Sequence, residues 1–121
     1  AAALLINREN PQEAIRLTMQ LYSWNPRSLV ATINHAAALL MNHRAAEAES
    51  LLRNIDTNKL GRAETPFYLL HLCEAYFDQQ KYDSARETID MIDSTSLYPT
   101  QLQWLENARK EFARRRVGII K

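Results

Sequence analysis

Three residues between positions 65 and 78 have side chains that could do chemistry together: His71, Glu74 and Asp78. Their spacing of three and then four residues places them on one face of a helix. A histidine beside two carboxylates can bind a divalent metal or exchange protons with a substrate. One helix supplies only one side of a coordination shell, however, and no second ligand motif occurs in the sequence. We therefore interpret the three as a hydrated polar edge and expect no metal, no cofactor and no enzymatic activity.

Other patterns that carry chemistry are also missing from the sequence. It contains two glycines in all and has no phosphate-binding glycine loop, nucleophile elbow or HExxH pattern. Cys73 is the single cysteine, which excludes an internal disulfide and a cysteine-based zinc cluster but leaves the compartment open. We expect Cys73 to be a buried, unreactive thiol, and His35 and His43 to be a packing and a surface residue.

Composition points to one all-helical domain. The 121 residues are 46% hydrophobic and 24% charged, and they include only two glycines and four prolines. These values are typical of a folded protein with long helices, and no stretch alternates with the period of a strand. The longest apolar run, residues 1–6, is too short to cross a bilayer. Because the chain opens without a methionine, we expect it to be a piece of something longer.

Capping residues and breaks divide the chain into helices. Asn10 and Ser28 are typical N-caps, and Pro11 and Pro66 are typical of a first helical turn. We expect helices over residues 11–24, 29–41, 45–55, 66–77, 81–93 and 99–116, with a polar loop over 56–65. The expected apolar stripe of the first helix is Ala14, Leu17, Leu21 and Trp24, with Trp24 covering the end of a hairpin.

An alanine recurs at equivalent places in these helices. Ala14, Ala48 and Ala85 are separated by 34 and then 37 residues, and two helices fit into each interval. A period near 34 is typical of a helical repeat array, in which neighbouring units must stack to bury their apolar faces. A small residue is needed at such a place when two helices cross closely.

The pattern resembles the tetratricopeptide repeat (TPR) family. The third unit matches best, at Leu69, Leu72, Cys73, Tyr76, Tyr82, Ala85, Ile89 and Ile92. The second is a degenerate copy with Ala36, Leu39, Ala48, Leu52 and Ile55, and the first retains Ala2, Leu5, Ala14 and Pro26. The resemblance implies a right-handed superhelix of stacked antiparallel helix hairpins with a concave inner face. It divides the single domain 1–121 into a partial repeat (1–27), a second repeat with its loop (28–65), a third repeat (66–98), a capping helix (99–116) and a tail (117–121).

In the family the first helix of each pair lines the concave groove, which implies a binding surface here. The expected residues are Val30, Ile33, Asn34, Ala37, Leu40, Met41, Phe67, Leu70, His71, Glu74, Phe77 and Asp78, joined by Gln103, Trp104, Asn107 and Lys110 of the last helix. Such an apolar groove with a polar edge suits a partner protein's amphipathic helix or extended peptide. One TPR subset clamps C-terminal carboxylates, but Phe67 and His71 stand where its cations are required, so we expect no clamp.

Two alternatives remain open. The groove could be packed internally, which would make the chain a structural or regulatory segment of a larger protein. The chain could instead bind electrostatically through residues 109–121, where Arg109, Lys110 and Arg114-Arg115-Arg116 gather. The helix dipole already explains cations at a helix C-terminus. With a net charge of only +1, we expect neither nucleic acid nor an anionic membrane as the partner.

Overall fold

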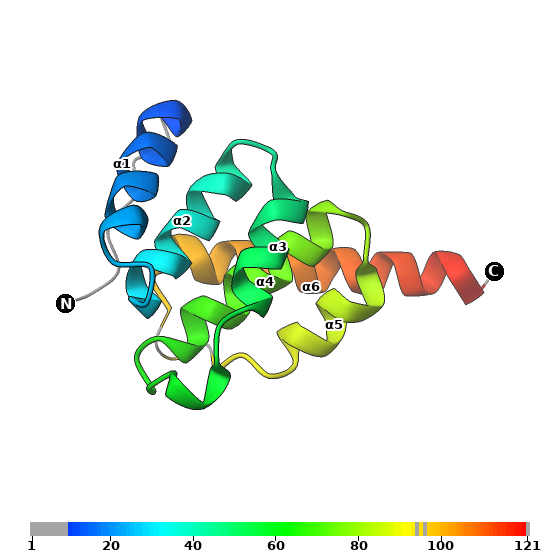
Figure 1. Cartoon of the computed structure of the whole chain (residues 1–121). Helices are drawn as coiled ribbons and strands as arrows, with labels where there is room; N and C mark the ends of the chain where they lie inside the picture. The colour runs from blue at the N-terminus through cyan, green and yellow to red at the C-terminus, as the bar shows by residue number, and fades with distance from the viewer. Residues whose placement is uncertain (1–9, 94, 96, 121) are drawn as a thin grey trace.

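The computed structural model describes residues 10–93, 95 and 97–120, without the side chains of 112 and 115–120. This part of the chain is all-helical and contains no strand, as the sequence predicts. Its elements are α1 (Pro11–Trp24), α2 (Leu29–Met41), α3 (Ala45–Arg53), the short 3-10 helix η1 (Thr57–Lys59), α4 (Thr65–Asp78), α5 (Tyr82–Ile89) and α6 (Pro99–Ile120) (Figure 1). The expected positions of Ala2 and Leu5 lie outside the described residues.

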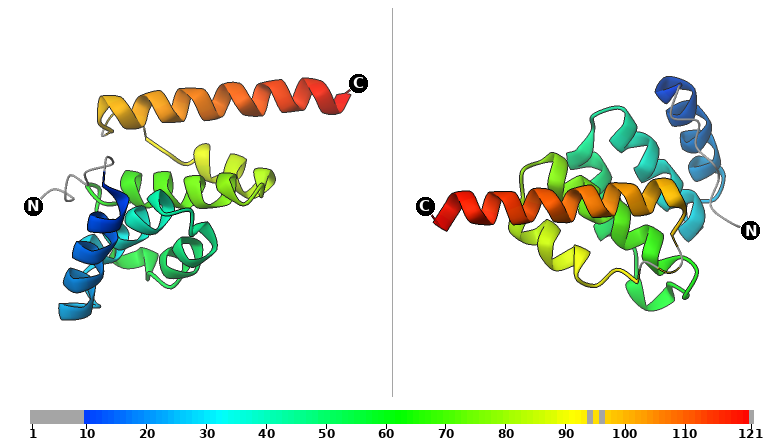
Figure 2. Two further views of the ribbon diagram at one scale, coloured as in Figure 1. Left: turned by 90° about the horizontal axis from the view of Figure 1, so that it is seen from above. Right: turned by 180° about the vertical axis from the view of Figure 1, so that it is seen from behind.

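Each of the first five helices packs against the next one along the chain, and α2 also packs against α4. Helices α2 to α5 therefore form a continuous layer, with α1 at one end (Figure 1). The long helix α6 lies on one side of this layer, and its C-terminal part extends past the other helices (Figure 2). Buried residues of α6 pack against both α4 and α5.

The helix starts follow the expected caps. Asn10 Oδ1 accepts a hydrogen bond from the Glu13 backbone N–H at 3.2 Å, and Ser28 Oγ accepts one from the Ala31 N–H at 3.1 Å. These bonds satisfy amides that have no partner within their own helix. Both boundaries could therefore be predicted from local sequence.

The turns between α2 and α3 and between α4 and α5 are built alike. His43 and Gln80 both have a left-handed backbone, with φ of 61° and 62°. After each of them, a backbone N–H returns to a helical carbonyl at 2.9 Å, from Arg44 to Leu39 and from Lys81 to Tyr76. The three positions in one turn are each related to those in the other by 37 residues, which is also the spacing of Ala48 and Ala85. The two helix pairs thus share one local design.

The recurring alanines lie inside the molecule. Ala14 is buried, and Ala48 and Ala85 have no exposed surface. Ala85 meets α4 closely enough for the Cys73 thiol to donate a hydrogen bond to its carbonyl oxygen at 3.4 Å. Ala48 belongs to a core cluster with Leu39 and Leu72. The expectation that these alanines face the interior is confirmed by their burial.

Some expected details are wrong. Trp24 is 72% exposed and Leu17 is 45% exposed, so neither belongs to the buried face of α1. That face contains Ala14 and Thr18 instead. Helix α3 ends at Arg53 and α5 at Ile89, two to four residues earlier than expected. The expected loop 56–65 contains η1, and α6 continues four residues past 116.

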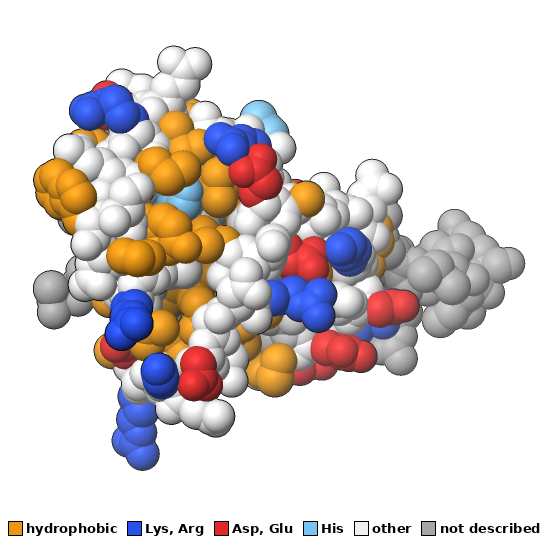
Figure 3. Space-filling model, in the orientation of Figure 1, with side chains coloured by type: hydrophobic (Ala, Val, Ile, Leu, Met, Phe, Trp, Pro, Cys, Tyr) orange, Lys and Arg blue, Asp and Glu red, His pale blue; other side chains and the backbone are white. Residues whose placement is uncertain are grey.

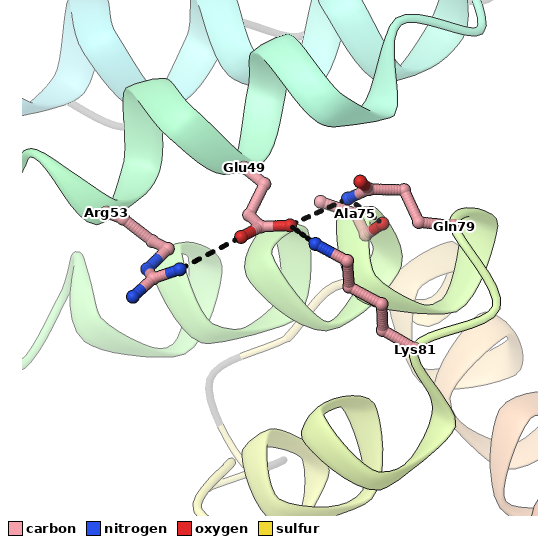
Figure 4. A network of polar contacts seen from close by, with 5 residues as sticks. All are labelled: Glu49, Arg53, Ala75, Gln79 and Lys81. Atoms are coloured by element: carbon pink, nitrogen blue, oxygen red, sulfur yellow. Dashed lines mark hydrogen bonds and ion pairs between the residues drawn. The ribbon is translucent and has the colours of Figure 1, made fainter.

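A polar network joins α3 to the turn between α4 and α5 (Figure 4). The buried carboxylate of Glu49 accepts hydrogen bonds from Gln79 Nε2 and Lys81 Nζ, both at 2.8 Å, and from Arg53 Nη1 at 3.2 Å. Burial alone would raise the pKa of Glu49, but the bonds from Lys81, Gln79 and Arg53 outweigh it and hold the pKa below its ordinary value. The network therefore fixes one helix pair against the other.

A larger side chain at Ala48 should destabilise the fold. The change Ala48→Leu forces a branched side chain into a site with no free space and should lower the free energy of unfolding by about 1–3 kcal/mol. Ala46 on the same helix is exposed, so Ala46→Leu is the matched control and should have little effect. Urea unfolding followed by circular dichroism measures both. Equal midpoints for the two variants would contradict the close helix contact.

Removing the Glu49 charge should weaken the link between the helix pairs. The change Glu49→Gln should lower the free energy of unfolding by about 1–3 kcal/mol at pH 7. The reason is that the carboxylate accepts charge-assisted hydrogen bonds from three donors, which an uncharged amide cannot replace. The folded pKa is lowered from 4.5, so the stabilisation is present above pH 4.5 and disappears as the pH falls through the folded pKa. The urea midpoints of the variant and the parent should therefore differ at pH 7 and approach each other at pH 3. Glu47→Gln, which breaks only an exposed pair with Arg44, is the control.

Candidate functional site

Half of the expected groove residues line one cavity. It has a volume of about 470 Å³ and lies between α2, α4 and α6; we call it the α2–α4–α6 cavity. Its lining consists of Ala37, Leu40, Met41, His43, Ala45, His71, Glu74, Asp78 and Trp104. Six of these residues are among the twelve that the sequence predicts for a groove on α2 and α4.

The other six expected residues lie outside this lining. Ile33, Asn34 and Leu70 are buried, and Leu70 has no exposed surface. Phe67, Phe77 and Val30 are half-buried. Phe77 packs edge-on against Trp104 with ring centroids 6.1 Å apart, and Phe67 lies 5.7 Å from the ring of Tyr98. Much of the apolar surface of α4 is therefore used inside the chain, by α5, α6 and the segment that leads into α6.

Helix α6 closes one side of the cavity with Trp104. Leu105 and Ala108, one and four residues further on, are buried against α4 and α5 and so fix the orientation of α6. The neighbouring expected residues Gln103, Asn107 and Lys110 are exposed and do not line the cavity.

The polar wall of the cavity comes from α4. His71, Glu74 and Asp78 all line it, as their spacing predicts. His71 Nδ1 lies 3.4 Å from Glu74 Oε1, yet this buried nitrogen has no hydrogen-bond partner. Burial, and then the negative charge of Glu74, raise the pKa of Asp78, while His43 opposes the rise. The wall therefore contains two carboxylates and one buried nitrogen without a hydrogen-bond partner.

The turn residue His43 is a lining residue that the groove prediction missed. Its left-handed backbone ends α2 and places it at the edge of the cavity. The signal in the sequence was the short break Asn42-His43-Arg44, which marks a turn but does not say where its side chains point. In the part of the chain that the structure describes, no three His, Cys, Asp or Glu side chains form a group that could hold a metal ion.

His35 belongs to a separate polar contact between α1 and α2. Its Nδ1 lies 3.1 Å from Thr18 Oγ1, and its ring stacks on Tyr22 with centroids 5.6 Å apart. Burial, reinforced by the positive charge of Arg44, lowers the pKa of His35. A neutral, packed histidine with a hydroxyl partner holds two helices together, which agrees with the packing role expected from the sequence.

Outside the α2–α4–α6 cavity, two further surfaces were candidates. On the side opposite α6, hydrophobic side chains gather over α1 to α3, with charged side chains around them (Figure 3). A cavity of about 330 Å³ lies between the start of α2 and the end of α3, lined by Tyr22, Leu29, Leu51 and Ile55 among others. Among the described side chains, His71 Nδ1 alone is a buried polar atom without a partner, so this cavity offers no comparable group.

The basic end of the chain is only partly described. Arg109 and Lys110 are exposed on α6, and Arg114 pairs with Glu111 on the same helix. This pairing reduces the positive field that the described part of α6 presents. In addition, no helix within the described ranges is long and apolar enough to span a membrane.

Comparisons with known proteins do not identify the chain. No protein-family model matches it, and neither a curated protein nor a solved structure matches it significantly. The chemistry of the α2–α4–α6 cavity therefore has to be judged from its own geometry.

Cys73 should react with thiol reagents only when the protein opens. Its thiol is fully buried, and burial, followed by the nearby Glu74 charge, raises its pKa to about 12. Reaction with Ellman's reagent at pH 8 should be slow for the folded protein and fast in urea. The absorbance of the released thiolate measures both rates. A folded-state rate close to that in urea would show that the thiol is accessible after all.

Proposed function

We propose that the chain is a non-catalytic protein-interaction module of the TPR type, which binds a partner's helix or extended segment in the α2–α4–α6 cavity. The repeat assignment rests on the 37-residue relation between the two helix pairs. That relation covers the alanine contacts, the left-handed turn residues and the hydrogen bonds that close each turn. Stacking of such pairs with a constant offset would produce the superhelix and its concave face.

The observation that carries the binding role is the accessible cavity itself. It combines an apolar floor from Ala37, Leu40 and Met41 with polar groups on one side, as peptide-binding sites do. Its acidic wall, Glu74 and Asp78, would repel a terminal carboxylate. Asn34 stands where the carboxylate-clamp subset of the TPR family has one of its asparagines, but here it is buried. The partner would therefore present a side-chain surface rather than its C-terminus.

A structural role within a larger protein is the second candidate. It is favoured by the packing of Leu70 and Phe77 against α6, which leaves a cavity rather than a long open groove. On this interpretation α6 would be the natural occupant of the concave face, and the remaining cavity would need no partner.

Binding in the cavity should depend on Met41. Peptides selected from a random 16-residue display library should bind with micromolar affinity, and Met41→Gln should weaken them about three- to tenfold by removing apolar contact. Met41 is preferable to Leu40, whose burial would make a polar substitution disruptive. The matched control is Met91→Gln, at an exposed methionine outside the cavity lining. Fluorescence anisotropy measures the affinities.

Two results would contradict the interaction role. One is a library that yields no saturable binder. The other is a set of binders that Met41→Gln leaves unchanged, which would place binding elsewhere and favour the structural role for this face.

A further inference from the structure

The α2–α4–α6 cavity contains one buried polar atom without a hydrogen-bond partner and two carboxylates. His71 is 7% exposed and lines the cavity, and its Nδ1 has no hydrogen-bond partner. Glu74 Oε1 lies 3.4 Å from this nitrogen, without forming a hydrogen bond to it. Asp78 follows one turn later on the same wall. A buried polar atom without a partner is uncommon in folded proteins and indicates a group that is still to be supplied.

The lining contains two carboxylates, and its basic side chains are the histidines His43 and His71. Two carboxylates, Glu74 and Asp78, face the cavity, and among its described lining residues there is no lysine or arginine. Burial and then the Glu74 charge raise the pKa of Asp78, and the opposing effect of His43 does not cancel the rise. A cation placed here would relieve that repulsion and give both carboxylates a partner.

A further part of the lining is aromatic. Trp104 lines the cavity from α6, and its contact with Phe77 is edge-on, at 74° between the ring planes. The indole is the aromatic ring that attracts cations most strongly, and a planar guanidinium can stack on it. An ammonium group is a compact, strongly hydrated point charge and uses such a wall less well.

We propose that the α2–α4–α6 cavity is the specificity pocket of the module and binds the guanidinium of an arginine in the partner segment. The guanidinium has five N–H donors, which suit the carboxylates of Glu74 and Asp78 and the unpartnered Nδ1 of His71. Its apolar stem would lie along Leu40 and Met41. A volume of about 470 Å³ leaves room for the side chain. The inference rests on the proposed function, because it names the chemistry of that partner.

The direct test uses an arginine fragment rather than an unknown partner. N-acetyl-arginine amide is titrated into the ¹⁵N-labelled protein at constant ionic strength, and the two tryptophan indole signals are followed by NMR. The Trp104 signal should shift with a dissociation constant on the order of a few millimolar, as expected for a small fragment. The Trp24 signal, from an exposed ring on α1, should stay in place. N-acetyl-citrulline amide has the same shape without the charge and should leave both signals unmoved.

Variants separate the acidic wall from general effects. Asp78→Asn, at an exposed position that should tolerate the change, is expected to weaken the arginine fragment several-fold. The double change Glu74→Gln and Asp78→Asn should weaken it about tenfold or more. Glu106→Gln removes an exposed carboxylate of α6 that does not line the cavity and is the matched control. Circular dichroism verifies that each variant is folded.

The outcomes are distinct from those for the proposed function. The inference is overturned if Trp104 does not respond up to about 50 mM fragment, a range well above the expected dissociation constant. It is also overturned if citrulline acts as strongly as arginine, or if Asp78→Asn changes nothing. Library peptides that bind through Met41 but show no preferred arginine would sustain the module and remove the arginine pocket. An arginine response without any library binder would instead support the arginine pocket and count against the peptide-binding module.

Discussion

The structure depends on close approach of helices at alanines. Where Ala48 and Ala85 stand, a neighbouring helix leaves no exposed surface, and at Ala85 even a thiol–carbonyl hydrogen bond fits between α4 and α5. Close contact requires the two helices of a pair to be joined by a tight turn. His43 and Gln80 supply it by adopting the left-handed backbone at a moderate energetic cost. The buried alanine and the left-handed turn residue thus occur together in each helix pair, and the combination is repeated after 37 residues.

A repeated pair does not by itself fix how one pair sits on the next. Apolar contacts between α2, α3 and α4 supply most of the attraction, but such contacts tolerate sliding. Glu49 restricts how the pairs can be placed, because its carboxylate accepts hydrogen bonds from Gln79 and Lys81 of the next pair only when these lie at defined positions. If the pairs slid, a buried charge would lose its partners, which costs far more than the loss of an exposed ion pair. Register is therefore set by one polar residue in an otherwise apolar contact.

Local features of this fold could be predicted and non-local ones could not. The Asn10 and Ser28 caps and the alanine spacing depend on neighbours in sequence, and the structure contains them. The same reasoning assigned Trp24 and Leu17 to the core, since hydrophobic periodicity does not say whether a partner helix exists on that side. Six of the twelve expected groove residues line the cavity, whereas Phe77 and Leu70 pack inside the chain. Their burial follows from α6 and α5, whose docking is a long-range event without a local signal.

The position of α6 has a consequence for the chemistry of the cavity. Trp104 belongs to the same helix as Leu105 and Ala108, which are buried against α4 and α5, so the aromatic wall exists only while α6 is docked. The acidic wall, by contrast, lies on α4 and is present in either case. A ligand that contacts both walls binds the docked state better than the undocked one and must stabilise it by that difference. For such a ligand, occupancy of the cavity and docking of α6 would be thermodynamically linked, and each would strengthen the other.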